Sequence, residues 1–430
     1  TAVISGAIGF LRTYFALDSG ETGWAASSAL IGCLAGAGIA GTLSDMAGRK
    51  KALLLAGFLF TVSAFWSALA HSLTEFSIAR ILGGVGIGMA SLLSPLYIAE
   101  IAPARSRGRL VSFNQFAIVS GILVVYFVNY FIANAETEEW NLQWGWRWMF
   151  GSAAIPAILF FLLVFFIPES PRWLVKRRRS PEALNILTRM AGREHAEAEI
   201  RSIEETVTRE KGSAVQLFQP GMRLPLLIGI VLAILQQVTG INVFMYYAPE
   251  IFKQLGSGTS AALLQTIVIG AVNLAFTIVA LKTIDKLGRK PLMIIGSAGM
   301  GISLTALGLA AYFQKTELWV LIFILGYIAS FALSMGPVVW VVLSEIFPTK
   351  IRGRAMSIAT LILWAANYLV SQTFPIMNEN PWLVEKFNHA FPFAVYALFC
   401  VLTIIFVKFF VPETKGKSLE EIEHSWRKRF

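Results

Sequence analysis

The sequence predicts an all-α membrane protein in which twelve transmembrane helices form two pseudo-symmetric six-helix bundles, with short cytoplasmic linker helices between them. Three observations predict this class: the composition, the length and number of the apolar segments, and an internal repeat. Of the 430 residues, 56% are hydrophobic and only 14% are charged, whereas soluble domains carry about a quarter charged residues. The surplus apolar surface therefore needs lipid as its solvent.

Apolar segments recur along the whole chain, each about long enough to cross ~30 Å of hydrocarbon at 1.5 Å per residue. We expect helices, because a backbone inside lipid must satisfy its hydrogen bonds internally. The first segment, 1–17, is shorter than a full span, so we expect the natural chain to begin before Thr1. The remaining spans are predicted at 24–43, 52–70, 76–98, 110–132, 148–167, 224–248, 261–283, 291–312, 318–343, 355–377 and 391–411.

Basic residues concentrate in alternate loops and are scarce in the loops between them. The positive-inside rule places the basic loops, and with them both chain ends, in the cytoplasm. The net charge of +10 is thereby explained by membrane orientation, and no nucleic-acid partner is expected. The basic loops carry Arg49, Lys50, Lys51, Arg105, Arg107, Arg109, Lys282, Lys286, Arg289, Lys290, Lys350, Arg352 and Arg354.

Three motifs each occur twice, in the same order and each time after an even-numbered span. This repetition indicates two parallel halves of six spans. We therefore predict an N-terminal bundle at 1–168, linker helices at 169–223, a C-terminal bundle at 224–412 and a cytoplasmic tail at 413–430. The motif pairs are Asp45–Lys50 with Asp285–Lys290, Glu100–Arg109 with Glu345–Arg354, and Pro168–Ser170 with Pro412–Thr414.

The repeat suggests a mechanism, because two similar bundles can rock about a site at their interface and open it alternately to each side. A solvated basic loop explains the cationic residues, but it does not explain the acidic residues that match them. We predict that these charges form a cytoplasmic latch when the inner side is shut. The latch residues are Asp45, Arg49, Glu100, Arg107, Asp285, Arg289, Glu345 and Arg352.

Polar side chains within the spans are functional candidates. In the seventh span, Gln236, Gly240 and Tyr247 are predicted near one helical face, and Gly240 and Pro249 are expected to let the helix bend. Amides offer paired donors and acceptors that suit vicinal hydroxyls, and a flat indole such as that of Trp340 can cover the C–H face of a pyranose. Amides also join helices to one another, and this alternative stays open for Asn129 and Asn273.

The pattern therefore favours a small neutral sugar as the bound molecule. No metal-ligand cluster, nucleotide loop or nucleophile elbow stands out in the sequence. We expect no metal site, no cofactor and no enzymatic activity.

The segments Arg107–Phe116 and Asn242–Pro249 most resemble bacterial D-xylose/proton symporters, which are members of the sugar porter family of the major facilitator superfamily. Three further motifs resemble that family as a whole. They are Gln236-Gln237-x-x-Gly240-Ile241-Asn242, Pro168-Glu169-Ser170-Pro171-Arg172-Trp173 and Pro412-Glu413-Thr414-Lys415-Gly416. The resemblance implies gating roles for Tyr246 and its neighbour Tyr247. It implies sugar contacts from Gln115, Gln236, Gln237, Asn242, Asn273, Trp340 and Trp364.

The resemblance also implies proton coupling through an aspartate one residue before Thr1, paired with Arg80. Two positions depart from these patterns: Ile122 stands where the xylose symporters have a Gln, and Leu363 stands where the family usually has Gln or Asn. We expect a monomer in a bacterial inner membrane that transports a pentose or hexose with a proton. A facilitative uniporter and a transporter-like sugar sensor remain alternatives.

Overall fold

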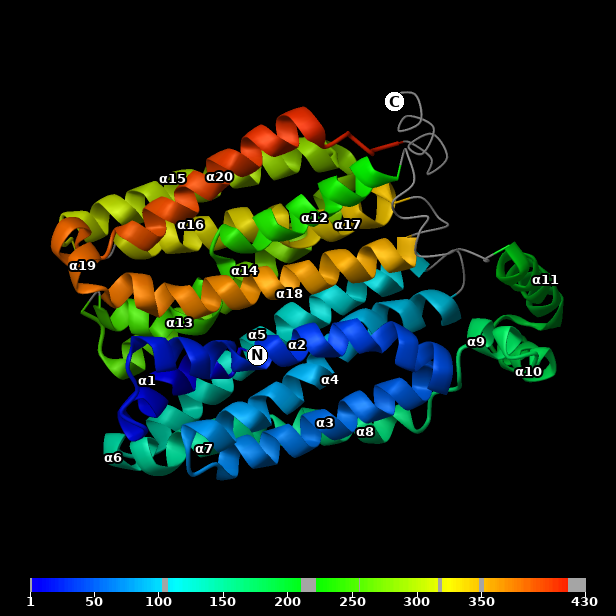
Figure 1. The fold of residues 1–430 in the computed structure, drawn as a ribbon, viewed down its shortest axis with the longest axis horizontal. Coiled ribbons are helices and arrows are strands. Elements are labelled where there is room, and N and C mark those ends of the chain that lie inside the picture. Colours follow the sequence, from blue (N-terminus) through cyan, green and yellow to red (C-terminus); the bar gives the residue numbers. More distant parts are fainter. Residues whose placement is uncertain are drawn as a thin grey trace.

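The computed structural model describes residues 2–102, 107–209, 222–254, 256–315, 319–347 and 352–416. The helices form two bundles that lie side by side along the long axis of the molecule (Figure 1). Three further helices, α9–α11, lie beyond one end of the bundles, which we call the linker end. The other end, where α1, α6 and α19 lie, is called the opposite end. The predicted fold class is confirmed.

The N-terminal bundle contains α1 (Ile4–Tyr14), α2 (Ser19–Ala47), α3 (Arg49–Leu69), α4 (Leu73–Ile101), α5 (Arg107–Ala135), α6 (Glu138–Trp140), the π-helical turn η1 (Asn141–Gly145), α7 (Trp146–Ser152) and α8 (Ala154–Val164). The linker helices are α9 (Pro171–Lys176), α10 (Ser180–Ala191) and α11 (Arg193–Arg209). The C-terminal bundle contains α12 (Arg223–Val238), α13 (Ile241–Gln254), α14 (Thr259–Leu287), α15 (Arg289–Tyr312), α16 (Trp319–Leu333), α17 (Met335–Ile346), α18 (Arg352–Glu379), α19 (Pro381–Phe387) and α20 (Phe391–Phe410).

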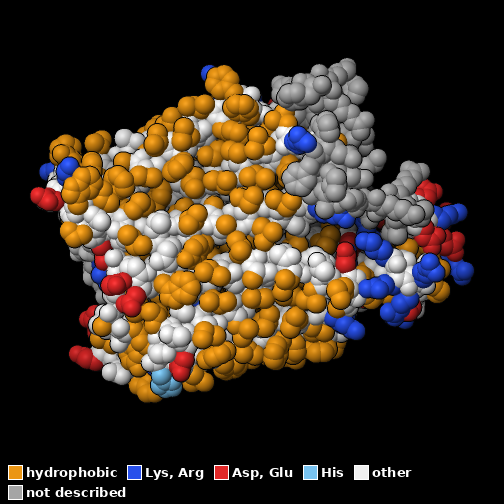
Figure 2. All heavy atoms as spheres, viewed as in Figure 1, with side chains coloured by type: hydrophobic (Ala, Val, Ile, Leu, Met, Phe, Trp, Pro, Cys, Tyr) orange, Lys and Arg blue, Asp and Glu red, His pale blue; other side chains and the backbone are white. Residues whose placement is uncertain are grey.

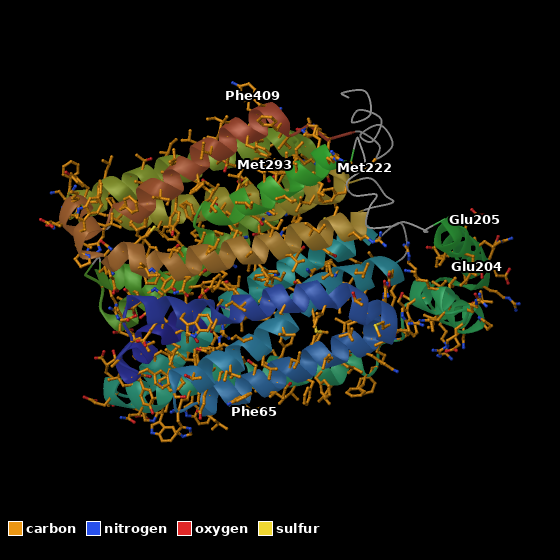
Figure 3. The ribbon with its side chains drawn as sticks, viewed as in Figure 1. Phe65, Glu204, Glu205, Met222, Met293 and Phe409 are labelled. Atoms are coloured by element: carbon orange, nitrogen blue, oxygen red, sulfur yellow. The ribbon has the colours of Figure 1, made fainter. Side chains whose placement is uncertain are left out.

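Eleven segments of the described chain are long and apolar enough to cross a membrane, and α1 is the shorter first segment. Their outer surface is apolar between the two ends, while Lys, Arg, Asp and Glu gather at the ends (Figure 2). Phe65 of α3 and Phe409 of α20 point outward (Figure 3) and are 50% and 67% exposed. Such exposed aromatic side chains are stable in lipid, where burying them would gain little.

The sequence repeat corresponds to a repeated structural unit at the linker end. Gly48 joins α2 to α3 with φ +98°, and Gly288 joins α14 to α15 with φ +91°, so both turns favour glycine. A Cβ at Gly48 would overlap the carboxylate of Glu169, and a Cβ at Gly288 would lie 2.8 Å from Oε2 of Glu413. Each glycine therefore permits a carboxylate to approach the start of the following helix.

These two carboxylates cap helix N-termini. Glu169 Oε1 accepts from the main-chain nitrogen of Arg49 at 2.9 Å, and Glu413 Oε1 accepts from that of Arg289 at 3.1 Å. Burial raises the pKa of Glu413, but four main-chain N–H donors outweigh it and hold this pKa below its usual range. Negative charge at a helix N-terminus is stabilising, so both caps fix how each helix begins.

Within the N-terminal bundle, α2 and α4 approach until their backbones touch. A Cβ at Gly32 would overlap the main-chain oxygen of Ile81, and a Cβ at Gly84 would overlap that of Ala29. Such small-residue contacts are typical of helix pairs in membranes, where dispersion replaces the hydrophobic effect between helices. The two helices therefore pack in direct backbone contact.

Candidate functional site

The candidate site lies where two membrane segments of the C-terminal bundle are interrupted. α12 ends at Val238 and α13 begins at Ile241, and Gly240 between them has φ +93°. α16 likewise ends at Leu333, immediately before α17. The predicted bend at Gly240 is confirmed, whereas Pro249 lies inside the continuous helix α13. An interrupted helix exposes main-chain groups that lack helical partners.

Three predicted amides form one hydrogen-bonded chain at these interruptions. Gln236 Nε2 donates to the main-chain oxygens of Met335 at 2.8 Å and Gly336 at 3.2 Å, which links the two interruptions. Gln237 Nε2 donates to Gln236 Oε1 at 3.4 Å, and Asn242 Nδ2 donates to Gln237 Oε1 at 2.5 Å. Among the described residues, no group bonds the second N–H of Gln237 or of Asn242, or Asn242 Oδ1, so these groups are available to a ligand.

The two predicted tryptophans lie on helices that pack around this cluster. Trp340 is half-buried on α17, one turn after Gly336. Trp364 is on α18, which packs against α12. Its indole Nε1 is buried without a hydrogen-bond partner among the described residues. Buried donors are rarely left unpaired, so this N–H is available to a bound hydroxyl.

The two remaining predicted amides come from opposite bundles. Asn273 is buried on α14, and Gln115 is half-buried on α5. These helices pack against each other across the interface between the bundles. Neither side chain hydrogen-bonds to another described residue, so the structure joins only Gln236, Gln237 and Asn242 directly.

The expectation that Gln236, Gly240 and Tyr247 share one helical face is wrong, because the chain leaves the helix before Gly240. Tyr247 instead donates its hydroxyl hydrogen to the main-chain oxygen of Ser371 on α18 at 2.9 Å. Tyr246 and Tyr247 are both buried in α13. Their gating role stays a prediction.

Polar contacts between the bundles close the opposite end. Arg12 of α1 forms a bidentate ion pair with Glu379 of α18, with N–O distances of 2.6 and 2.8 Å. Ser27 Oγ of α2 donates to Gln372 Oε1 of α18 at 2.7 Å, and Gln372 Nε2 donates to the main-chain oxygen of Gly20 at 2.9 Å. Sequence reasoning missed these residues, because no local pattern pairs side chains so far apart in the chain.

The predicted latch residues lie at the linker end but pair within their own bundle. Of the predicted latch arginines, the two whose side chains are described, Arg49 and Arg289, each pair with acids of their own bundle. The side chains of Arg107 and Arg352 lie outside the described residues, and a latch between bundles stays a prediction. The observed pairs are Arg49 with Asp45 (2.8 Å) and Glu100 (3.0 Å), and Arg289 with Asp285 (2.9 Å) and Glu345 (2.8 Å).

Arg80 is buried in α4 with its guanidinium largely unsatisfied. Nε and Nη2 have no hydrogen-bond partner in the described part of the chain, and the guanidinium lies 5.3 Å from the ring centre of Phe150. A cation–π contact compensates only part of the loss of water. The surroundings of Arg80 therefore suit a carboxylate.

Two pseudo-symmetric bundles around an uncharged polar site, closed at one end by separable contacts, define a secondary membrane transporter. The chain belongs to the sugar (and other) transporter family, whose sequence profile matches residues 7–426. Members of this family are transporters, so the protein is not an enzyme.

Individual relatives agree with this assignment. The chain is 46% identical to the D-xylose-proton symporter of Escherichia coli (strain K12), over 99% of this chain and 92% of the relative. It is also 46% identical to the arabinose-proton symporter of Bacillus subtilis (strain 168), over 100% and 91%. The solved structure of the major facilitator proton:xylose symporter XylE bound to 6-bromo-6-deoxy-D-glucose matches with a TM-score of 0.84 and 46% identity, over 99% and 95%. The predicted family resemblance is confirmed.

Proposed function

We propose that this protein carries a monosaccharide, a pentose or hexose, across the membrane by alternating access, coupled to the symport of a proton. The observation that carries the proposal is the uncharged amide chain of Gln236, Gln237 and Asn242 at two helix interruptions. Similarity to symporters named for xylose and arabinose supports the same substrate class.

The sugar lies between the amides of the C-terminal bundle and Gln115 of the N-terminal bundle. Gln237, Asn242 and Asn273 bond its hydroxyls, and Trp364 donates through Nε1. Trp340 covers a C–H face of the ring. Both amide hydrogens of Gln236 are engaged by the main chain of α17, so Gln236 meets the sugar as an acceptor.

Proton coupling depends on Arg80. A buried guanidinium with unsatisfied donors is strongly destabilising unless a carboxylate pairs with it, and we expect that acid one residue before Thr1. Protonating the acid breaks the pair, and deprotonating it restores the pair. This cycle makes the conformational change depend on the proton gradient.

The linker end faces the cytoplasm, because its loops carry the basic residues. The conformation described here is then closed toward the outside, and both chain ends lie inside. The bundles correspond to 1–168 and 224–412, with the linker at 169–223 and the tail from 413. The protein acts as a monomer in the lipid bilayer of a bacterial inner membrane.

The test uses proteoliposomes, a panel of pentoses and hexoses, and a pH electrode outside the vesicles. We expect uptake of at least one sugar, with sugar-evoked alkalinisation of the external solution. Uptake without a pH change would identify a uniporter. Calorimetric binding without uptake would favour a sensor, and absence of both binding and uptake for the whole panel would refute the proposed substrate class.

A further inference from the structure

The interruption between α12 and α13 is held by two buried tyrosines from neighbouring helices. Tyr327 of α16 donates its hydroxyl hydrogen to the main-chain oxygen of Thr239 at 2.9 Å. Tyr396 of α20 packs its ring against Gly240, where a Cβ would lie 2.6 Å from Cδ2 of that ring. Glycine is therefore needed at position 240 both for its positive φ and for this approach.

The position of this turn decides where the site amides lie. Gln236 and Gln237 belong to the last turn of α12, and Asn242 belongs to the first turn of α13. Any displacement at Thr239 or Gly240 therefore moves the glutamines relative to the asparagine. The two tyrosines act on the binding geometry without needing to touch the sugar.

The two tyrosines differ in the state of their hydroxyl groups. The hydroxyl of Tyr327 is paired, whereas that of Tyr396 is buried without a partner in the described part of the chain. Tyr396 as a whole is 2% exposed. A buried hydroxyl without a partner destabilises the conformation that contains it. The adjacent turn offers acceptors, because the last carbonyls of α12 lie beyond its helical donors. Those of Gln236 and Gln237 accept from Thr239 Oγ1 and from the main-chain nitrogen of Gly240, and each carbonyl oxygen has a second lone pair.

We propose that Tyr396 is a positioning residue that sets the balance between the two conformations of the sugar site. Its ring holds the Gly240 turn in the present conformation. Its hydroxyl bonds a main-chain oxygen of this turn when the opposite end is open. The unmade bond disfavours the present conformation and so keeps both conformations populated. The inference deepens the proposed function and rests on it.

The test is Tyr396→Phe, which keeps the ring and removes the hydroxyl. Spin labels at His71 and Glu385, both exposed at the opposite end, report by electron–electron double resonance how far the bundles separate without sugar. We expect the ratio of closed to open molecules to rise on the order of tenfold, with a lower Vmax. Tyr312→Phe is the control, since Tyr312 is 45% exposed at the opposite end.

An unchanged distance distribution in Tyr396→Phe would overturn the proposal. Weaker sugar binding by calorimetry, with unchanged distances, would overturn it as well, because the hydroxyl would then be a sugar ligand. A lower melting temperature alone, without a shift in distances, would reduce Tyr396 to a packing role. The proposed function can fail separately from this inference. In that case the wild-type protein would bind no sugar of the panel, while the spin-label distances in Tyr396→Phe would still differ from those in wild type.

Discussion

Breaking the ion pair between Arg12 and Glu379 should favour opening of the opposite end. Glu379→Gln keeps the shape of the side chain and removes its charge. The side chains are 41% and 26% exposed, so solvent screens the pair, and exposed ion pairs contribute at most about 1 kcal/mol. Because this pair exists only while the bundles touch, its loss should change the ratio of open to closed molecules by about fivefold.

The same spin-label distances measure this ratio in detergent or nanodiscs. The charge-swapped double variant Arg12→Glu/Glu379→Arg should restore the wild-type ratio, and high salt should shrink the difference between wild type and Glu379→Gln. Glu182→Gln is the control, because its partner Arg179 lies in the linker and the pair joins no bundles. If Glu379→Gln leaves the distance distribution unchanged at low salt, the pair does not hold the end closed.

Three further predictions follow from the same geometry. Gln236→Ala and Trp340→Ala should each abolish sugar uptake while gel filtration still shows folded protein; normal uptake in both would remove the assigned site. Gly84→Ala, whose Cβ would overlap a main-chain oxygen of α2, should destabilise the protein by ~1–3 kcal/mol in thermal melts, whereas Gly121→Ala has open space and should melt like wild type. The pKa of Glu413 is lower in the folded protein than the ordinary carboxylate pKa. The ionised carboxylate therefore stabilises the folded protein fully at pH values above the ordinary carboxylate pKa, and this contribution is lost as the pH falls through the lower pKa of the folded state. Exchange of the main-chain amide hydrogens at the start of α15, corrected for intrinsic rates, should therefore accelerate only at pH values below the ordinary carboxylate pKa. Glu413→Gln should remove this pH dependence.

Much of the fold could be predicted because membrane insertion is governed by local composition. The span lengths follow from hydropathy, and the repeated Gly48 and Gly288 follow from a turn that only glycine adopts easily. Even the carboxylates Glu169 and Glu413 were identifiable, since each repeats at the same place in its half. These features depend on short stretches of chain and hence are visible in the sequence.

The contacts between bundles could not be predicted in the same way. Arg12 and Glu379 are 367 residues apart, and they meet only in a conformation closed at the opposite end. The latch was predicted to join the two bundles, but Arg49 and Arg289 pair with acids of their own bundle in this conformation. The false helical face through Gly240 has a local cause: periodicity assumes a continuous helix, and one residue with positive φ resets the rotation of all that follow.

The repeat shows which irregularities serve the site. By their shared motifs, α4 corresponds to the segment formed by α16 and α17. Yet α4 runs unbroken from Leu73 to Ile101 and is locked to α2 by glycine contacts. The fold therefore does not require an interruption at this place. The C-terminal bundle has the interruption, directly before the first turn of α17, where Gln236 bonds the main-chain oxygens of Met335 and Gly336. Hence the interruption between α16 and α17 is found in the bundle that carries the amide chain and not at the matching place in the other bundle, which indicates that it serves the site.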